Sequence, residues 1–394
     1  MTRVKTKALS FVSASLLALT LTAMNPQNTM KANAKEVEND IKIAGTQVES
    51  DNASDVLFGD NGQYGFVDNS GTQTKTNNIM QSNITRLAGN NRYETAVKIS
   101  QATYDKSECV VLTNGLSFAD ALAGIPLAQK LNAPILLTPK DTLNPDTLAE
   151  IKRLDAKHII ILGGEGAVSK AVEKTLSETA SKIERIEGAS RYGTSVEVAK
   201  VLNDAPDTLF FVSGNDYADA LSVSPYAASQ SAPIIYLPKN GNVGAETLDY
   251  LAQLKTKKCV KQIYTIGGTG AVSDETAGQA IKALGISIDN ALRLAGENRY
   301  ETCVAVNFMF AEYAEDPSIC IATGADFPDA LAGGVFAAKN ASPLFLINGK
   351  LKTPSLSDEQ TAYLKNKKAN KITIFGGEGV VPDAYVGKVA MASV

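Results

Sequence analysis

Three copies of one arginine-containing motif, Arg-x-x-Gly-x-x-Arg-Tyr-x-Thr, occur about a hundred residues apart. Its two arginines per copy give six candidate anion-binding residues: Arg86, Arg92, Arg185, Arg191, Arg293 and Arg299. A guanidinium group binds phosphate or carboxylate through paired, charge-assisted hydrogen bonds. The same group also suits a buried Arg–Asp pair that locks a helix to a sheet, or one repeat to the next. The residues alone leave both roles open.

Three repeated carboxylates, Asp120, Asp219 and Asp329, each stand near the expected start of a helix. A carboxylate there stabilises unpaired backbone N–H groups and the helix dipole, so we expect a structural role, and contact with a bound ligand stays open. Catalysis is the alternative, but it usually needs a second acid, a histidine or a metal set, and no such partner is repeated. The single histidine, His158, aligns with Gln262 and Lys371, which argues against a repeated Ser-His-Asp triad.

Other residues that commonly carry chemistry are not arranged for it. The four cysteines, Cys109, Cys259, Cys303 and Cys320, lack metal-binding spacing, and we expect buried free thiols. The sequence Gly163-Gly164-Glu165-Gly166 departs from the dinucleotide and P-loop patterns. It predicts a tight turn that needs positive φ or close backbone approach. No cofactor and no metal are therefore expected.

The N-terminus has the order of a secretory signal peptide over residues 1–34. A basic start is followed by an apolar run from Ala8 to Ala23 and by the small-x-small sequence Ala32-Asn33-Ala34. The full chain of 394 residues has 38 basic and 42 acidic residues, and the signal contains four basic residues and no acidic one. The mature chain would carry a net charge of −8, so anion binding must be local rather than driven by bulk charge. No nucleic acid partner is expected, nor any membrane contact after signal removal.

Residues 35–84 are polar, and we interpret them as a spacer or small N-terminal segment, with one candidate hairpin at Tyr64–Thr72. Three tandem repeats follow, at residues 85–183, 184–291 and 292–394. Each contains the arginine motif, a Gly-x-x-aromatic-x-Asp-Ala-Leu stretch, an apolar stretch with proline and the glycine turn. Four landmarks in three copies establish internal repetition.

Strands and helices alternate within each repeat. In the first copy the patterns predict helices over 92–104, 118–132, 145–154 and 169–178, and strands over 109–115, 134–139 and 158–164. Such alternation indicates βαβ units with a mainly parallel sheet. The fold class predicted is therefore α/β, with three tandem parallel-sheet modules of about 100 residues each. Parallel sheets bind ligands at the C-terminal ends of their strands, which places the landmarks at a binding edge.

At these residues the chain resembles the cell wall binding repeat 2 family of Gram-positive surface proteins, which includes clostridial S-layer-associated proteins and autolysin modifiers of bacilli. The resemblance implies three Rossmann-like modules packed around a pseudo-threefold axis. It also implies noncovalent anchoring to an anionic, teichoic-acid-like polymer on peptidoglycan, and thus a secreted protein of the cell wall or cell surface. The family's apolar binding stretch maps to Pro134, Ile135, Leu136 and Leu137.

The second and third copies depart from that stretch, as Pro233-Ile-Ile-Tyr236 and Pro343-Leu-Phe-Leu346, so equal affinity of the three copies is not expected. Repeated weak sites would raise the avidity for a repeating polymer. Other surface-layer proteins, or a separate autolysin (amidase) that this chain modifies or positions, are the further partners implied. Direct hydrolysis is not expected. A small-molecule α/β binding protein is the remaining alternative.

Overall fold

The computed structural model describes residues 83–118, 120–314 and 316–393, together with a separate hairpin of strands β1 (Val56–Phe58) and β2 (Tyr64–Phe66). The predicted signal peptide lies outside these residues. The turn and second strand of the hairpin predicted at Tyr64–Thr72 lie outside the described residues. Strand β2 pairs antiparallel with β1, which precedes it. The intervening residues include Asn61-Gly62, which is a stronger hairpin signal than Asn-Ser-Gly.

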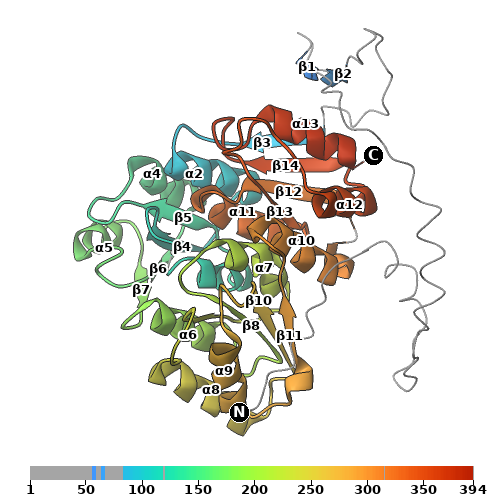
Figure 1. Cartoon of the computed structure of the whole chain (residues 1–394). Coiled ribbons are helices and arrows are strands. Elements are labelled where there is room, and N and C mark those ends of the chain that lie inside the picture. The colour runs from blue at the N-terminus through green and yellow to red at the C-terminus, as the bar shows by residue number, and fades with distance from the viewer. Residues whose placement is uncertain (1–55, 59–63, 67–82, 119, 315, 394) are drawn as a thin grey trace, which may run out of the picture. The chain divides into compact units, whose positions relative to one another are not determined.

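Three parallel four-stranded sheets form the rest of the described chain, and all have the same strand order (Figure 1). The first sheet has the order β5 (Ile135–Thr138), β4 (Cys109–Asn114), β6 (His158–Leu162) and β7 (Lys182–Ile186). The second has the order β9 (Ile234–Leu237), β8 (Thr208–Ser213), β10 (Gln262–Ile266) and β11 (Ala291–Leu294). The third has the order β13 (Leu344–Ile347), β12 (Ser318–Thr323), β14 (Lys371–Phe375) and β3 (Ile84–Leu87). The predicted α/β fold with parallel sheets is confirmed.

The first strand of the repeat region closes the last sheet. Strand β3 pairs with β14, and Figure 1 shows these two strands side by side although they lie at opposite ends of the repeat region. The strands that carry Arg185 and Arg293, β7 and β11, likewise complete the sheets of the preceding repeats. Each sheet is therefore offset from the sequence repeat by one strand, and we call the three structural units modules 1, 2 and 3 after their sheets.

Four helices accompany each sheet. Module 1 contains α2 (Arg92–Thr103), α3 (Ile125–Lys130), α4 (Pro145–Leu154) and α5 (Lys170–Ser177). Module 2 contains α6 (Arg191–Leu202), α7 (Ala218–Ser229), α8 (Ala245–Lys257) and α9 (Asp274–Leu284). Module 3 contains α10 (Arg299–Met309), α11 (Pro328–Lys339), α12 (Asp358–Lys367) and α13 (Asp383–Ala392). Asn144 caps α4, since its side chain accepts hydrogen bonds from two backbone N–H groups.

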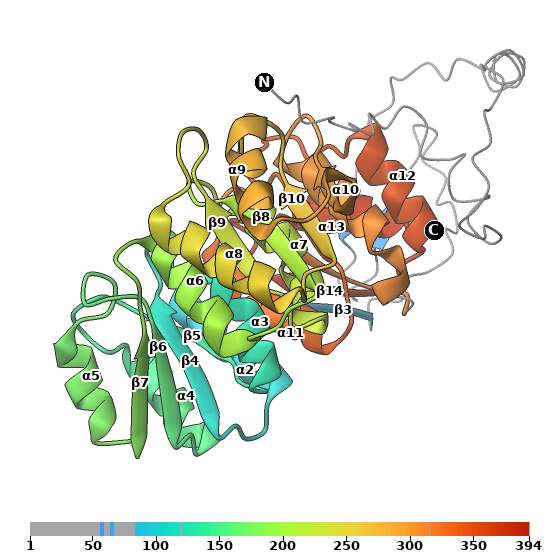
Figure 2. The same cartoon turned by 90° about the horizontal axis from the view of Figure 1, so that it is seen from below.

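Helices α3, α7 and α11 occupy equivalent places in the three modules, and each contacts the other two (Figure 2). The buried residues of α7 and α11 include many small ones, which allows close approach. One continuous apolar cluster runs through all three modules, including Leu122, Leu221 and Leu331 at equivalent positions. The modules thus share a core, and residues at the start of one central helix can reach the next module.

The prediction of a regular helix over residues 118–132 is wrong in its first half. Here a 3₁₀ turn (Leu122–Gly124) precedes the short helix α3, whereas α7 and α11 are continuous. In module 2 the carboxylate of Asp216 accepts hydrogen bonds from the N–H groups of Tyr217 and Ala218 as the helix begins. Ser117 stands at this position in module 1 and has no carboxylate, so the helix start loses that stabilisation.

Candidate functional site

The first arginine of each motif lies on the edge strand of a sheet and holds the glycine turn beside it. Each donates from Nη1 to a turn carbonyl, at 2.8 Å for Arg86 and Arg185 and 2.7 Å for Arg293. Each also donates from Nη2 to an acid in the first turn of the following helix. The pairs are Arg86–Asp383 (2.5 Å), Arg185–Glu173 (2.6 Å) and Arg293–Asp274 (3.0 Å). The sequence left open whether these arginines bind an anion or form Arg–acid pairs within the protein. These contacts are those of Arg–acid pairs that hold the helix to the sheet.

The glycine turns have the backbone geometry that the sequence predicts. Gly163, Gly267 and Gly376 have φ of +96°, +97° and +105°, a region that favours glycine. The carboxylates of Asp120, Asp219 and Asp329 pack against these glycines: a Cβ at Gly267 would lie 2.2 Å from Asp219 Oδ2. The repeated aspartates therefore lie between a central helix start and a turn that only glycine fits.

Replacing Gly267 with alanine should destabilise the protein, because the new Cβ requires a strained φ and meets the Asp219 carboxylate. We expect a loss of about 1–3 kcal/mol in the free energy of unfolding, measured by urea titration. Gly270→Ala is the matched control, since a Cβ there meets nothing within 4 Å. Equal stability of the two variants would contradict the assignment of strain to this turn.

The second arginine of each motif is the first residue of a helix. Its side chain contacts the loop that follows strand β4, β8 or β12 of the same module. Arg92, Arg191 and Arg299 each donate from Nη1 to the carbonyl of Gly115, Gly214 or Gly324, all at 2.7 Å. The other side of the guanidinium faces the adjacent module. Arg299 Nη2 donates to Asp216 Oδ2 at 2.8 Å, and Arg92 Nη2 lies 3.6 Å from Asp326 Oδ2. Two of these arginines also lie over an aromatic ring: Arg191 is 5.6 Å from the ring centroid of Phe118, and Arg299 is 5.2 Å from that of Tyr217.

Three aromatic side chains meet where the modules join. The ring centroids of Phe118 and Tyr217 are 5.5 Å apart, those of Phe118 and Phe327 are 5.8 Å apart, and those of Tyr217 and Phe327 are 5.9 Å apart. These edge-on and tilted contacts are favourable for aromatic pairs. The three rings follow strands β4, β8 and β12, so the cluster lies at the C-terminal ends of these strands. With Arg92, Arg191 and Arg299, we call it the junction ring.

The sequence reasoning did not single out the junction ring aromatics, nor Asp216 and Asp326. The signal was present, because the aligned stretches Gly-x-Ser-Phe, Gly-x-Asp-Tyr and Gly-x-Asp-Phe all place an aromatic residue three positions after the glycine. Only the packing of the modules brings the three positions together. The tyrosines of the motif, Tyr93, Tyr192 and Tyr300, pack on the apolar core.

The apolar stretch from Pro134 to Leu137 lies inside module 1 rather than on its surface. Ile135, Leu136 and Leu137 are buried in strand β5, which contacts α2 and α11. Any effect of this stretch on binding would act through the packing of α2, whose first residue is Arg92. In module 2 the counterpart of Leu137 is Tyr236, whose hydroxyl accepts a hydrogen bond from the N–H of Ala123 in module 1 at 3.1 Å. This departure from the first copy forms a contact between modules.

The remaining candidates for chemistry are structural within the described residues. All four cysteines are free thiols; Cys109, Cys303 and Cys320 are buried, and Cys259 is half-buried. His158 Nε2 lies 3.2 Å from Glu184 Oε2 on the neighbouring strand. No group of histidine, cysteine and acidic side chains in the described part of the chain could hold a metal ion. Among the helices of residues 83–393 that the structure describes, none has the length and apolarity to cross a bilayer.

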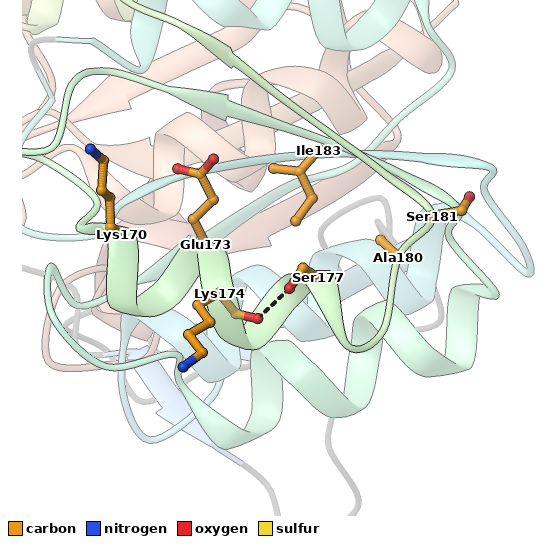
Figure 3. Close-up of a pocket in the computed structure, with 7 residues that line it drawn as sticks. All are labelled: Lys170, Glu173, Lys174, Ser177, Ala180, Ser181 and Ile183. Carbon is orange, nitrogen blue, oxygen red and sulfur yellow. Dashed lines mark hydrogen bonds between the residues drawn. The ribbon is translucent and has the colours of Figure 1, made fainter.

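A shallow open groove of about 480 Å³ lies between α5 and β7 (Figure 3). Its lining residues are not those of the junction ring. Lys170 and Glu173 line one end, and Ala180 and Ile183 are its apolar residues. Two of its charged residues are engaged in ion pairs, Lys170 with Glu165 and Glu173 with Arg185. We therefore do not place the functional site there.

The fold and the junction ring define a repeat protein whose modules meet at a cationic and aromatic surface. The profile of the Cell wall binding domain 2 (CWB2) family matches residues 86–173, 185–277 and 293–386. This chain therefore belongs to that family of cell wall binding domains, as its sequence motifs predicted.

Two curated proteins of Bacillus subtilis (strain 168) are similar to the chain. N-acetylmuramoyl-L-alanine amidase LytC is 31% identical over 303 residues, which are 77% of this chain and 57% of that protein. The amidase enhancer is 32% identical over 262 residues, which are 66% of this chain and 34% of that protein. The chain thus spans little more than half of the first relative and about a third of the second.

Two solved structures from Clostridium difficile have a similar fold. Cwp8 superposes with a TM-score of 0.69 at 34% identity, covering 79% of this chain and 52% of that one. Cwp6 superposes with a TM-score of 0.70 at 26% identity, covering 90% of this chain and 54% of that one. These similarities support the fold of three α/β modules.

Proposed function

We propose that this chain is exported and attaches noncovalently to the Gram-positive cell wall by binding an anionic, teichoic-acid-like polymer. Family membership supports wall binding. The observation that carries the polymer assignment is the junction ring, where Arg191 lies over the ring of Phe118 and Arg299 over that of Tyr217 at the strand ends. Arginine recognises phosphate oxygens, and aromatic rings offer faces to sugar or polyol carbons. No catalytic step is proposed for the chain itself.

Local placement of the arginines also reconciles anion binding with an acidic protein. The mature chain would carry a net charge of −8, so its overall field repels a polyanion. Charges farther apart than about 8 Å are largely screened at physiological salt. An arginine held in place by a backbone carbonyl can therefore bind an anion that the distant acids hardly affect.

A pull-down on purified cell walls tests this proposal. The mature chain, Lys35–Val394, is incubated with intact walls and with walls stripped of anionic polymer by hydrofluoric acid, over a range of salt concentrations. We expect binding to intact walls that weakens with salt and falls about ten-fold or more on stripped walls. Equal binding to both preparations would assign the chain to peptidoglycan, and binding to neither would contradict wall attachment.

A second candidate function is suggested by the relatives named for an amidase and an amidase enhancer. The chain would then modify or position a separate autolysin on the wall. Adding the chain to walls undergoing digestion by a purified amidase distinguishes the two. A changed digestion rate would favour the modifier function, and an unchanged rate would favour attachment alone.

A further inference from the structure

Two of the three module junctions contain an aspartate that joins one module to the next. Asp216 Oδ1 accepts hydrogen bonds from the N–H groups of Tyr217 and Ala218, and its Oδ2 accepts from Arg299 of module 3. Asp326 Oδ1 accepts from the N–H of Phe327, and its Oδ2 lies 3.6 Å from Arg92 of module 1. At both junctions one carboxylate thus neutralises the arginine and satisfies backbone donors.

The third junction, between modules 1 and 2, has the arginine without the acid. Ser117 stands where the other copies have Asp216 and Asp326. Arg191 retains the hydrogen bond to the Gly214 carbonyl and lies over Phe118, so its position is fixed. Within residues 83–118, 120–314 and 316–393, it makes no ion pair.

This difference makes the junction of modules 1 and 2 more positive than the other two by one charge. The aspartates beside the glycine turns do not cancel this difference in charge, because each module has one of them: Asp120, Asp219 or Asp329. Ser117 is half-buried, and its hydroxyl group is a hydrogen-bond donor. Beside it, Leu116 is 67% exposed, where the other copies have Asn215 and Ala325.

We propose that this junction binds one phosphodiester group of the wall polymer, and that the other two junctions do not bind one. The inference rests on the proposed function and specifies its ligand group and location. The phosphate oxygens replace the carboxylate of the other junctions. They accept hydrogen bonds from the Arg191 guanidinium and the Ser117 hydroxyl. Leu116 offers an apolar surface to the adjoining polyol or sugar. At the other junctions a phosphate would first have to displace Asp216 or Asp326.

Restoring the missing acid tests the proposal directly. Ser117→Asp should fold, because two copies already have aspartate there, and it should weaken binding to intact walls about ten-fold or more. Ser117→Asn has the same shape without the charge and should bind within about two-fold of the natural protein. Gln230→Glu, at the opposite end of α7, adds the same charge away from the site and should also bind normally. Equal binding by all three variants would overturn the inference while leaving wall attachment standing.

A direct titration separates this site from wall binding as a whole. Arginine side-chain NMR signals would be followed while inorganic phosphate and poly(glycerol phosphate) are added to the natural protein and to Ser117→Asp. We expect a saturable shift of the Arg191 signal that is absent in the variant, with tighter binding of the polymer. No shift with either probe would overturn the site, and equal affinity for the two would overturn its assignment to a polymer. A normal shift without wall binding would instead contradict the proposed function.

Discussion

A chain that begins at Ala88 is expected to lose the stability of its last module, although the deletion removes residues of the first repeat. The deletion removes strand β3, whose four residues pair with β14. It also removes the hydrogen bond from Gly376 N–H to the Leu87 carbonyl and the pair between Arg86 and Asp383. At about 1 kcal/mol for each hydrogen bond lost, the free energy of unfolding should fall on the order of 4 kcal/mol.

The measurement is amide hydrogen exchange compared with a chain that begins at Asn83 and retains β3. Exchange should rise most in β14 and α13 of module 3, which β3 and Arg86 contact. Strands β4 and β6 of module 1 should remain protected. Exchange that rises mainly in module 1 would show that the sequence repeat, rather than the sheet, is the cooperative unit.

The second large effect expected is a loss of stability between about pH 4 and pH 7 caused by two buried carboxyl groups. Burial, and then repulsion from Asp216, raises the pKa of Asp219 to about 6. Burial, and then repulsion from Asp326, raises the pKa of Asp329 to about 6, while Thr95 and Arg92 oppose the rise. Because the folded pKa exceeds the ordinary value of 3.8, the folded state holds these protons more tightly than the unfolded chain.

The contribution of the protonated Asp219 and Asp329 carboxyl groups to the free energy of unfolding is therefore complete below about pH 4. It is lost as the pH rises through about 6. A difference of about two pKa units corresponds to on the order of 3 kcal/mol for each group. Asp219→Asn should reduce the fall in unfolding free energy between pH 4 and pH 7 by about that amount, measured by urea titration at each pH. Asp141→Asn, at an exposed carboxyl group, is the control. Parallel pH profiles for Asp219→Asn and the natural protein would contradict the raised pKa.

Much of the fold follows from local sequence patterns. Continuous apolar runs such as His158–Leu162 predict buried parallel strands, and β6 has that burial. Asn144 before Pro145 predicts the start of a helix, and α4 begins there. The turn at Gly163 follows from its glycines. These features depend on neighbouring residues, so a single sequence is sufficient to predict them.

The helix start at Phe118 shows where local patterns fail. The first copy has the same Ala-Asp-Ala-Leu sequence as the second, yet its helix begins later. Just before Phe118, Ser117 stands where the second copy has Asp216. That aspartate accepts backbone hydrogen bonds and pairs with Arg299 of another module. Propensity does not register the loss, because one of that aspartate's three hydrogen bonds is with a residue distant in the sequence.

The sequence by itself determined the α/β class, the threefold repetition, the glycine turns and the membership of a wall-binding family, since each is encoded in residue types at short spacing. The tertiary structure decided which arginines lock a turn and which face another module. It also decided that β3 completes the last sheet, and that three aromatic residues from three repeats meet at one surface. The physical reason is that the arginine motif has the same local form in every copy. Whether an acidic side chain neutralises its second arginine depends on residues of another module, which only the packing of the modules brings near.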